Sequence, residues 1–158
     1  MSELFGDVAE HLFDLGYQPI PLRGKVPCVS EWQKIPITSE LVSHWATNGQ
    51  AECNVGLRTG QGENALYACD IDVLDLDVSR AIRDSFSRRF GAGVLRVGRA
   101  PKVLMVYRGI PGKKKINSAT WRDPSGTAHK VELLGSGQQF MATGVHPDTG
   151  KQIGRAHV

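Results

Sequence analysis

The sequence contains no run of about 18 apolar residues, the length at which a segment becomes a candidate membrane-spanning helix. Its first residues, 1–5, also lack the basic segment followed by an apolar stretch that marks a secretory signal. Both absences argue against a membrane or secreted protein, so we expect a cytoplasmic protein without a membrane partner.

Cysteine is scarce, and its positions form no pair. Cys28, Cys53 and Cys69 are odd in number and widely separated, and no CxxC motif occurs. This pattern fits reduced thiols and argues against a zinc site built from cysteines.

The sequence also has little excess charge of either sign, because the net charge is only +3. Such a charge permits contact with a polyanion without requiring it.

Several common catalytic motifs are missing. The sequence has no GxxxxGK[ST] phosphate loop and no HExxH metalloprotease motif. Gly60-Gln61-Gly62 lacks the glycine spacing of a dinucleotide-binding fingerprint. No serine or cysteine nucleophile has an evident base beside it.

A chain of 158 residues, 41% of them hydrophobic, is long enough for one domain with a buried core. The last six residues, Ile-Gly-Arg-Ala-His-Val at 153–158, resemble the translation of a sequencing adapter. We therefore expect one domain over residues 1–152 that is truncated at its C-terminal end, followed by an artefactual tail over 153–158.

Periodicity predicts helices first and strands later. Apolar residues at helical spacing predict helices at 4–15, ending before Gly16, at 41–45 with Ser39 as N-cap, and at 78–90, ending at Gly91. Extended or strand segments are predicted at 17–22, 54–59, 66–72, 94–97, 103–107, 129–134 and 138–143, with a basic, polar connection at 109–127. This order predicts a mixed α/β sandwich in which helices pack on a sheet.

The strongest local signal is the segment Ala-Cys-Asp-Ile-Asp at 68–72. Alternate side chains of a strand point to the same face, so Asp70 and Asp72 project together. Two such close carboxylates repel each other unless a cation lies between them, and hard oxygen ligands suit Mg²⁺ or Mn²⁺. The alternative is a polar strand end that caps the next helix, but Asp75 and Asp77 are better placed for capping.

A further carboxylate, Glu132, lies inside the apolar strand predicted at 129–134. Its burial is costly unless it is paired or binds a metal. If this strand lies beside the 66–72 strand, Glu132 completes a three-carboxylate metal site with Asp70 and Asp72. The alternative is a salt bridge with Lys130 or with another cation across the sheet.

Four cations surround the strands predicted at 94–97 and 103–107, namely Arg96, Arg99, Lys102 and Arg108. A guanidinium group offers a planar fork of donors that suits phosphate oxygens. Arg99 and Lys102 share the turn between the strands and can reach one ligand, although a solvated turn is the alternative for either alone. The run Lys113–Lys115 is either solvated surface or a salt-sensitive contact with a nucleic-acid backbone.

Two glycine-containing segments follow, Gly-Ser-Gly-Gln-Gln at 135–139 and Gly-Val-His-Pro-Asp-Thr-Gly at 144–150. Glycine permits close approach of the backbone to a ligand. Gln138 and His146 are therefore candidates to hydrogen-bond a phosphate or a sugar. A single histidine in a turn is more often structural, so His146 is a candidate because of the residues around it.

The order of these motifs resembles the bifunctional DNA primase/polymerase N-terminal domain of the archaeo-eukaryotic primase superfamily, which is common in phages and plasmids. The motifs that carry the resemblance are Cys69–Asp72, Arg96–Lys102, Val131–Phe140 and Gly144–Gly150. The resemblance extends from the segment around Pro21–Pro27 and Trp32 to about Gln152.

The resemblance implies an α+β fold, with an RRM-like antiparallel or mixed sheet, packed helices and an additional N-terminal α/β unit. It implies that Asp70, Asp72 and Glu132 are catalytic and bind Mg²⁺ or Mn²⁺. It further implies a nucleotide-binding set consisting of Arg96, Arg99, Lys102, Gln138 and His146. The implied reaction is templated nucleotidyl transfer from an NTP or dNTP in DNA replication. The resemblance also implies a phage or plasmid gene whose product acts in the bacterial cytoplasm. The implied partners are a DNA template and primer, and a helicase domain is expected downstream in the full-length protein.

The sequence departs from the family pattern at one point, because many members carry a small-residue-x-His motif between the two acidic motifs. Arg99 and Lys102 occupy that stretch here, and His146 in the later turn is the candidate to supply the imidazole.

The sequence is open to two other functions. An RRM-like binding module without catalysis would place sheet aromatics, rather than carboxylates, against nucleic acid. A metal-dependent nuclease or topoisomerase-primase domain would place its glutamate before the DxD pair, whereas Glu132 follows it.

Overall fold

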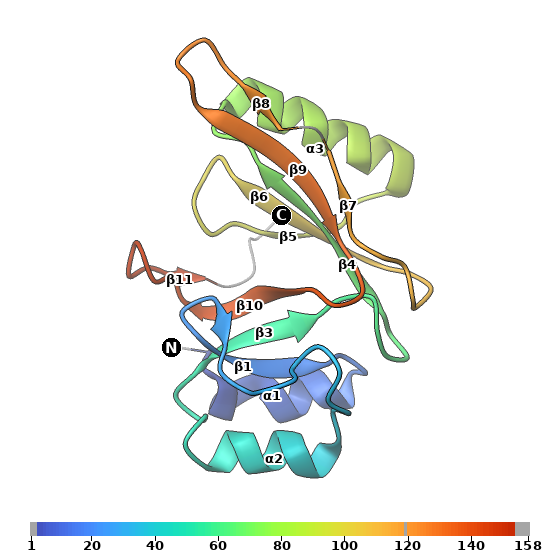
Figure 1. The fold of residues 1–158 in the computed structure, drawn as a ribbon, viewed down its shortest axis with the longest axis vertical. Coiled ribbons are helices and arrows are strands. Elements are labelled where there is room, and N and C mark those ends of the chain that lie inside the picture. The colour runs from blue at the N-terminus through green and yellow to red at the C-terminus, as the bar shows by residue number, and fades with distance from the viewer. Residues whose placement is uncertain (1–2, 119, 154–158) are drawn as a thin grey trace.

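The computed structural model describes residues 3–118 and 120–153, which form helices and two antiparallel sheets (Figure 1). The helices are α1 (Phe5–Asp14), α2 (Ser39–Thr47) and α3 (Leu76–Phe90). The expected α+β class is confirmed. Periodicity alone did not divide the strands between the two sheets, because alternation along a strand shows which residues face a core but not which strands pair.

The first sheet has five strands and is covered on one face by α1 and α2 (Figure 1). In spatial order its strands are β11 (Gln152–Ile153), β10 (Gln139–Val145), β3 (Asn54–Arg58), β1 (Pro19–Arg23) and β2 (Val26–Pro27). Phe5 of α1 and Val42 of α2 are fully buried against Val55 of β3. This cluster attaches both helices to the sheet.

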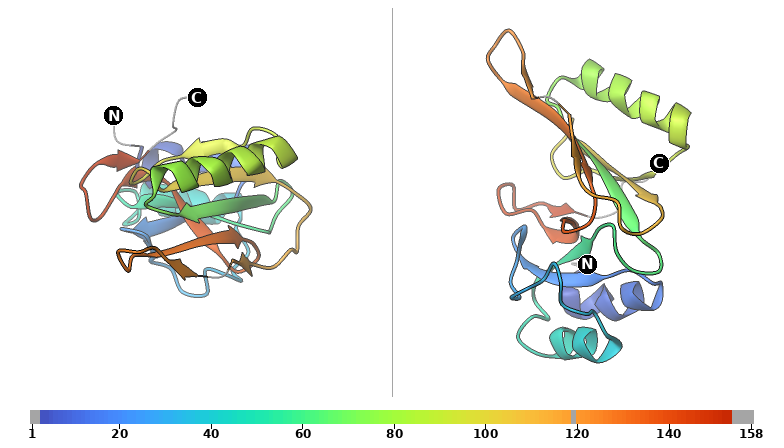
Figure 2. Two further views of the ribbon diagram at one scale, coloured as in Figure 1. Left: turned by 90° about the horizontal axis from the view of Figure 1, so that it is seen from above. Right: turned by 45° about the vertical axis from the view of Figure 1, so that its right-hand side comes forward.

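The second sheet carries α3 on the face that lies away from the first sheet (Figure 2). In spatial order its strands are β5 (Val94–Arg96), β6 (Val103–Arg108), β4 (Leu66–Asp72), β9 (Ala128–Leu134) and β7 (Ile116–Asn117), and β8 (Trp121–Arg122) also pairs with β9. Cys69 and Ile71 pack toward Ile82 and Phe86 of α3. The opposite face of β4, which bears Asp70 and Asp72, is therefore left for the space between the sheets.

A third apolar cluster joins the two sheets at the base of that space. Leu57 of β3 and Phe140 of β10 pack there against Leu66, Leu104 and Leu134 of the second sheet. The chain passes directly from β9 in one sheet to β10 in the other. The sheets are thus in contact along one end of β4, while its other end, at Asp70 and Asp72, borders a cleft.

Most predicted elements are present with shifted ends. The N-cap of α2 is Thr38 and not Ser39, because the Thr38 Oγ1 accepts a hydrogen bond from the Leu41 N–H at 3.2 Å. The predicted connection at 109–127 contains the short strands β7 and β8, and two residues each are too few to show alternation. Of the tail expected at 153–158, residues 154–158 lie outside the described residues, and Ile153 pairs with Gly144.

No helix in the described part of the chain has the length and apolar character needed to cross a membrane.

Candidate active site

Asp70 and Asp72 lie on the same face of β4, as the two-residue period of a strand requires. The neighbouring strand β9 is antiparallel and places Glu132 directly opposite Asp70. Side chains in such opposed positions have Cβ atoms about 4.5–5.5 Å apart. The strand that carries Glu132 therefore lies beside the strand that carries Asp70 and Asp72.

The close carboxylates affect the acidity of Asp70. Burial raises the pKa of Asp70 above its ordinary value, and the charges of Asp72 and Glu132 act in the same direction. Arg96 and Lys130 lower this pKa. The Asp70 carboxylate therefore lies where additional positive charge is favourable, which is the electrostatic requirement of a cation site.

The other two carboxylates each have a lysine partner. Lys102 forms an ion pair with Asp72. The Nζ atoms of Lys115 and Lys130 lie 2.9 and 3.2 Å from Oε1 of Glu132. Burial alone raises the pKa of Glu132, but hydrogen bonds and charge from both lysines outweigh it and hold this pKa below its ordinary value. The salt bridge that the sequence offered as the alternative for Glu132 is therefore present.

The turn between β5 and β6 is held in place by α3. Arg96 ends β5, Arg99 and Lys102 lie in the turn, and the Ala100–Pro101 peptide bond is cis. The hydroxyl of Ser79, a buried residue of α3, donates a hydrogen bond to the Pro101 carbonyl at 2.9 Å. Ser79 thus positions the cationic turn. Nothing in the sequence distinguishes it from other helix serines.

Arg96 is the most enclosed cation of this group. Burial lowers its pKa, and the Asp70 charge opposes that shift. Its Nε atom is buried and has no hydrogen-bond partner among the described residues. Arg108, which the sequence grouped with it, instead donates a hydrogen bond to the Tyr17 hydroxyl at 2.6 Å. Arg96 therefore retains donor capacity next to Asp70.

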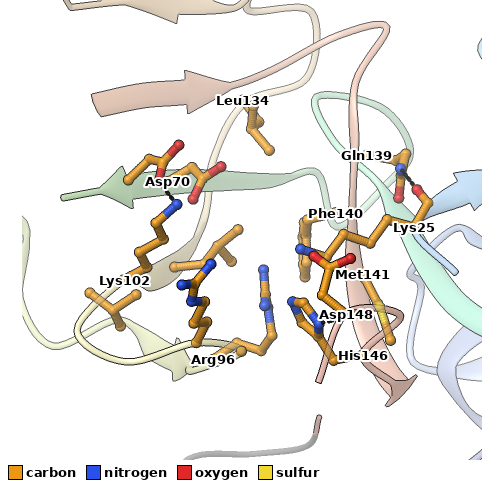
Figure 3. Close-up of a pocket in the computed structure, with 15 residues that line it drawn as sticks. Lys25, Asp70, Arg96, Lys102, Leu134, Gln139, Phe140, Met141, His146 and Asp148 are labelled. Atoms are coloured by element: carbon orange, nitrogen blue, oxygen red, sulfur yellow. Dashed lines mark hydrogen bonds and ion pairs between the residues drawn. The ribbon is translucent and has the colours of Figure 1, made fainter. Parts of the chain in front are cut away.

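The first sheet supplies the opposite wall of the site (Figure 3). A cavity of about 270 Å³ lies between Asp70, Asp72 and the β5–β6 turn on one side and residues of the first sheet and its loops on the other. The polar residues of that second wall are Lys25, Gln139, His146 and Asp148. Sequence reasoning named only His146 among these four, although Lys25 lies in a turn whose two cations are evident in the sequence.

The structure places Gln139, and not Gln138, on the cavity wall. Gln138 Nε2 donates to the Gly137 carbonyl at 3.3 Å, and Gln138 does not line the cavity. Gln139 Nε2 donates to the Lys25 carbonyl at 3.0 Å, and its Oε1 is buried without a hydrogen-bond partner in the described part of the chain. Gln139 is the first residue of β10, whereas Gln138 precedes the strand.

His146 is almost fully buried, with 3% of its surface exposed. Its Nδ1 accepts a hydrogen bond from the Asp148 N–H at 3.2 Å, so a neutral imidazole carries its proton on Nε2. Burial lowers the pKa of His146, and the charges of Lys25, Arg96 and Arg99 lower it further, against the opposing charge of Asp148. His146 is therefore a neutral hydrogen-bond donor near neutral pH.

The carboxylates of the site can be compared with the ligands that a divalent metal prefers. Mg²⁺ and Mn²⁺ favour carboxylate oxygens, and one or two carboxylates together with substrate phosphates suffice for Mg²⁺. Asp70 and Asp72 fit this chemistry. Within the described residues, however, no group of three or more His, Cys, Asp and Glu side chains is arranged to hold a metal. Glu132 is paired instead with Lys115 and Lys130.

The chain matches the family model of the bifunctional DNA primase/polymerase N-terminal domain over residues 9–156. A comparison with curated proteins gives no match. The matched stretch contains both acidic strands, the β5–β6 turn and the turn that carries His146. The resemblance that the order of motifs indicated is therefore confirmed.

Proposed function

This chain belongs to the bifunctional DNA primase/polymerase N-terminal family, and we propose that it catalyses metal-dependent, templated nucleotidyl transfer from an NTP or dNTP during DNA replication. One observation carries the proposal. The carboxylates of Asp70 and Asp72 border a cavity whose other walls carry mainly cations and neutral hydrogen-bond donors. A nucleoside triphosphate with divalent metal has the complementary charge pattern.

Asp70 and Asp72 would hold the metal through their carboxylate oxygens, and Glu132 is the candidate for a third ligand opposite Asp70. Both lysines contact Oε1 of Glu132, so its second oxygen is the one proposed to face a metal. A bound Mg²⁺ or Mn²⁺ supplies the charge that activates the attacking hydroxyl and stabilises the leaving oxygen.

The cations of the cavity would bind the triphosphate. Arg99 and Lys102 lie in one turn and can neutralise the charge that develops on the leaving pyrophosphate. His146 would donate a hydrogen bond through Nε2 without gaining a charge. Arg96 would use its unpaired Nε and its guanidinium fork on an oxygen close to Asp70. Gln138, which precedes Gln139, is proposed as a further nucleotide-binding residue.

The resemblance supports three finer proposals about the setting. They are a phage or plasmid origin, action in the cytoplasm of the bacterial host, and a helicase domain as a partner in replication.

The test is primer extension with purified protein, Mn²⁺ and labelled dNTPs. Asp70→Asn and Asp72→Asn should each lower incorporation by at least about 100-fold, since even outer-shell partners of metal ligands typically contribute 10–100-fold. Asp77→Asn, an exposed aspartate of α3, is the matched control and should retain incorporation. Circular dichroism checks that each variant is folded. Incorporation that survives the Asp70→Asn plus Asp72→Asn double substitution would contradict the proposed site.

A further inference from the structure

Two of the three cysteines lie next to each other in the fold, although 25 residues separate them in the sequence. Cys28 directly follows β2, and Cys53 directly precedes β3. Their Sγ atoms are 3.8 Å apart, so the two thiols are in contact as free thiols. Both side chains are half-buried, which leaves the pair within reach of small molecules in solution. Neither cysteine lines the cavity described above.

The pair lies where the chain leaves the first sheet and later rejoins it. The excursion between the two cysteines contains α2. At one end, the Cys28 N–H donates a hydrogen bond to the Pro21 carbonyl of β1 at 3.1 Å. At the other end, the Cys53 carbonyl accepts a hydrogen bond from the Phe5 N–H at the start of α1 at 2.8 Å. A bond between the sulfurs would therefore close the excursion at a base whose backbone is already held on both sides.

Asn54 connects this base to the wall of the cavity. It directly follows Cys53, and its Nδ2 donates hydrogen bonds to the carbonyls of Gly24 at 3.0 Å and Val145 at 2.9 Å. Gly24 lies in the turn between β1 and β2, next to Lys25, which lines the cavity. A bond from Cys28 to Cys53 would thus add a covalent restraint to the hairpin that presents Lys25.

The two thiols differ in how firmly they hold their protons. The Cys28 thiol donates to the Pro21 carbonyl, with the Sγ atom 3.4 Å from the oxygen. Burial raises the pKa of Cys53 to about 11, and the hydrogen bond and charge of Cys28 act in the same direction, against the charge of Arg23. The thiolate is the reactive form of cysteine. Cys53 therefore keeps its proton, and the first attack on an oxidant falls to Cys28.

Cys69 provides an internal reference for a thiol that an oxidant does not reach. It is fully buried in the second sheet and packs in the apolar cluster under α3. Burial, and to a lesser extent the charge of Asp70, raises the pKa of Cys69 to about 12. Enclosed thiols of this kind are inert.

We propose that Cys28 and Cys53 form a redox-active pair, which hydrogen peroxide converts into an intramolecular disulfide and a thiol reductant restores. A disulfide holds its sulfurs about 2.05 Å apart, so the two Sγ atoms, now at 3.8 Å, have a gap of about 2 Å to close. The proposal does not depend on the proposed function. In reducing compartments, disulfides of this kind are usually transient and redox-sensing.

The oxidation takes place in two steps. The Cys28 thiolate attacks one oxygen of the peroxide, the O–O bond breaks, and the departing hydroxide takes up a proton and leaves as water. The product is a sulfenic acid on Cys28. The Cys53 sulfur then attacks the Cys28 sulfur, the S–S bond forms, and the S–O bond breaks. The hydroxyl group leaves with the Cys53 proton as a second water, so the two sulfurs have given two electrons to the peroxide.

The test is peptide mapping of the full chain by mass spectrometry, before and after a small molar excess of hydrogen peroxide. Trypsin places the three cysteines on separate peptides, because Lys34 and Arg58 lie between them. The peptides of Cys28 and Cys53 should be recovered joined, two hydrogens lighter than their sum, whereas Cys69 should be alkylated as a free thiol. The melting temperature should rise by roughly 5–10 °C on oxidation, and dithiothreitol should reverse both changes.

Two serine variants are the matched controls, since each replaces only a sulfur by an oxygen. Cys53→Ser should stop at the sulfenic acid of Cys28, which dimedone traps, and its melting temperature should not rise with peroxide. Cys28→Ser should consume peroxide at least about tenfold more slowly than wild type, because the remaining thiol keeps its proton. Circular dichroism checks that both variants are folded. If Cys28→Ser reacts as fast as wild type, the assignment of the first attack to Cys28 is wrong.

The wild-type map alone can overturn the pair, even where a serine variant does not fold. Cys28 and Cys53 that both remain alkylated after peroxide, or that appear only in links between two chains, would contradict an intramolecular disulfide. An equal rise in melting temperature in wild type and Cys53→Ser would show that oxidation elsewhere causes it. None of these measurements uses a nucleotide or DNA, so their failure leaves the proposed function as it stands.

Discussion

Polar side chains in this protein differ in whether all of their hydrogen-bonding atoms have partners. Arg96 and Gln139 border the cleft, and each has a buried atom without a partner among the described residues. Asp123 and His129 show the opposite state. His129 Nε2 lies 2.9 Å from Asp123 Oδ2, and its Nδ1 accepts a hydrogen bond from the Leu74 N–H at 3.3 Å. Buried polar atoms without partners at the cleft indicate a ligand site. The Asp123–His129 pair is instead structural, because it joins the first residues of β9 to the segment after β4.

Asp123 gives a prediction about stability and pH. Hydrogen bonds from Ser125 and His129 lower the pKa of Asp123 from 3.8 to about 2. A carboxyl group with a lowered folded-state pKa contributes stability above its unfolded pKa and loses it as pH falls through the folded value. The free energy of unfolding should therefore decline between about pH 4 and pH 2, and Asp123→Asn should lack this part of the decline. Urea unfolding across this range is the measurement. Parallel pH profiles of the two proteins would contradict the assignment.

Residue positions were predictable where they followed from strand periodicity. Asp70 and Asp72 share a face because they are two residues apart, and Glu132 becomes their neighbour once β9 pairs with β4. The partners of these carboxylates were not predictable. Lys115 reaches Glu132 from the polar connection before β7, and sequence spacing does not encode such a contact between distant segments.

Helix ends depend on single capping residues, and α3 is the clearest case. Oδ1 of Asp75 accepts hydrogen bonds from the N–H groups of Asp77 and Val78 at 3.0 and 3.1 Å. Asp75 and Asp77 are better placed for capping than Asp70 in the sequence, and Asp75 is the cap in the structure. The acidic residues between β4 and α3 therefore divide into a pair that faces the cleft and a cap that begins the helix.

This division predicts distinct effects for neighbouring aspartates. Asp75→Ala removes the cap and should lower the free energy of unfolding by about 1 kcal/mol. Asp77→Ala removes only a charge near the helix N-terminus and should cost less, about 0.3–1 kcal/mol. Chemical denaturation measures both. Primer extension by both variants should exceed that of Asp70→Asn. If Asp75→Ala instead abolished extension without lowering stability, Asp75 would belong to the site.

The elements that the sequence missed are those that depend on their neighbours. β7 and β8 have two residues each and exist as strands only because they pair with β9. The longer strands and α1 and α3 were predicted because alternation and helical spacing are local properties. Assignment to one of two sheets is not local, because β9 and β10 adjoin in the chain and lie in different sheets.

At the scale of the whole molecule, the site exists only because two sheets face each other. Asp70 and Arg96 come from the second sheet, whereas Gln139 belongs to the first sheet and His146 follows its strand β10. The inter-sheet cluster, which includes Leu57 and Phe140, sets the distance between these walls. The net charge of +3 does not reveal the site, because its cations become a cluster only through folding.

Leu57 tests whether the inter-sheet cluster controls the site. Leu57→Ala should lower the free energy of unfolding by about 2–5 kcal/mol because it leaves a cavity between the sheets. It should also lower kcat/KM for dNTP by at least about tenfold, since a misplacement of about 1 Å in an active site can cost about 100-fold.

Val42→Ala is the control, because Val42 is also buried but packs between α2 and the first sheet, away from the cleft. It should lower stability by about 2 kcal/mol and leave kcat/KM near the wild-type value. Both enzymes are assayed well below their melting temperatures, so that the unfolded fraction does not contribute. An equal loss of kcat/KM in the two variants would mean that stability, and not the distance between the sheets, limits the reaction. A loss of kcat/KM confined to Leu57→Ala means that the contact between the sheets sets the position of His146 relative to Asp70.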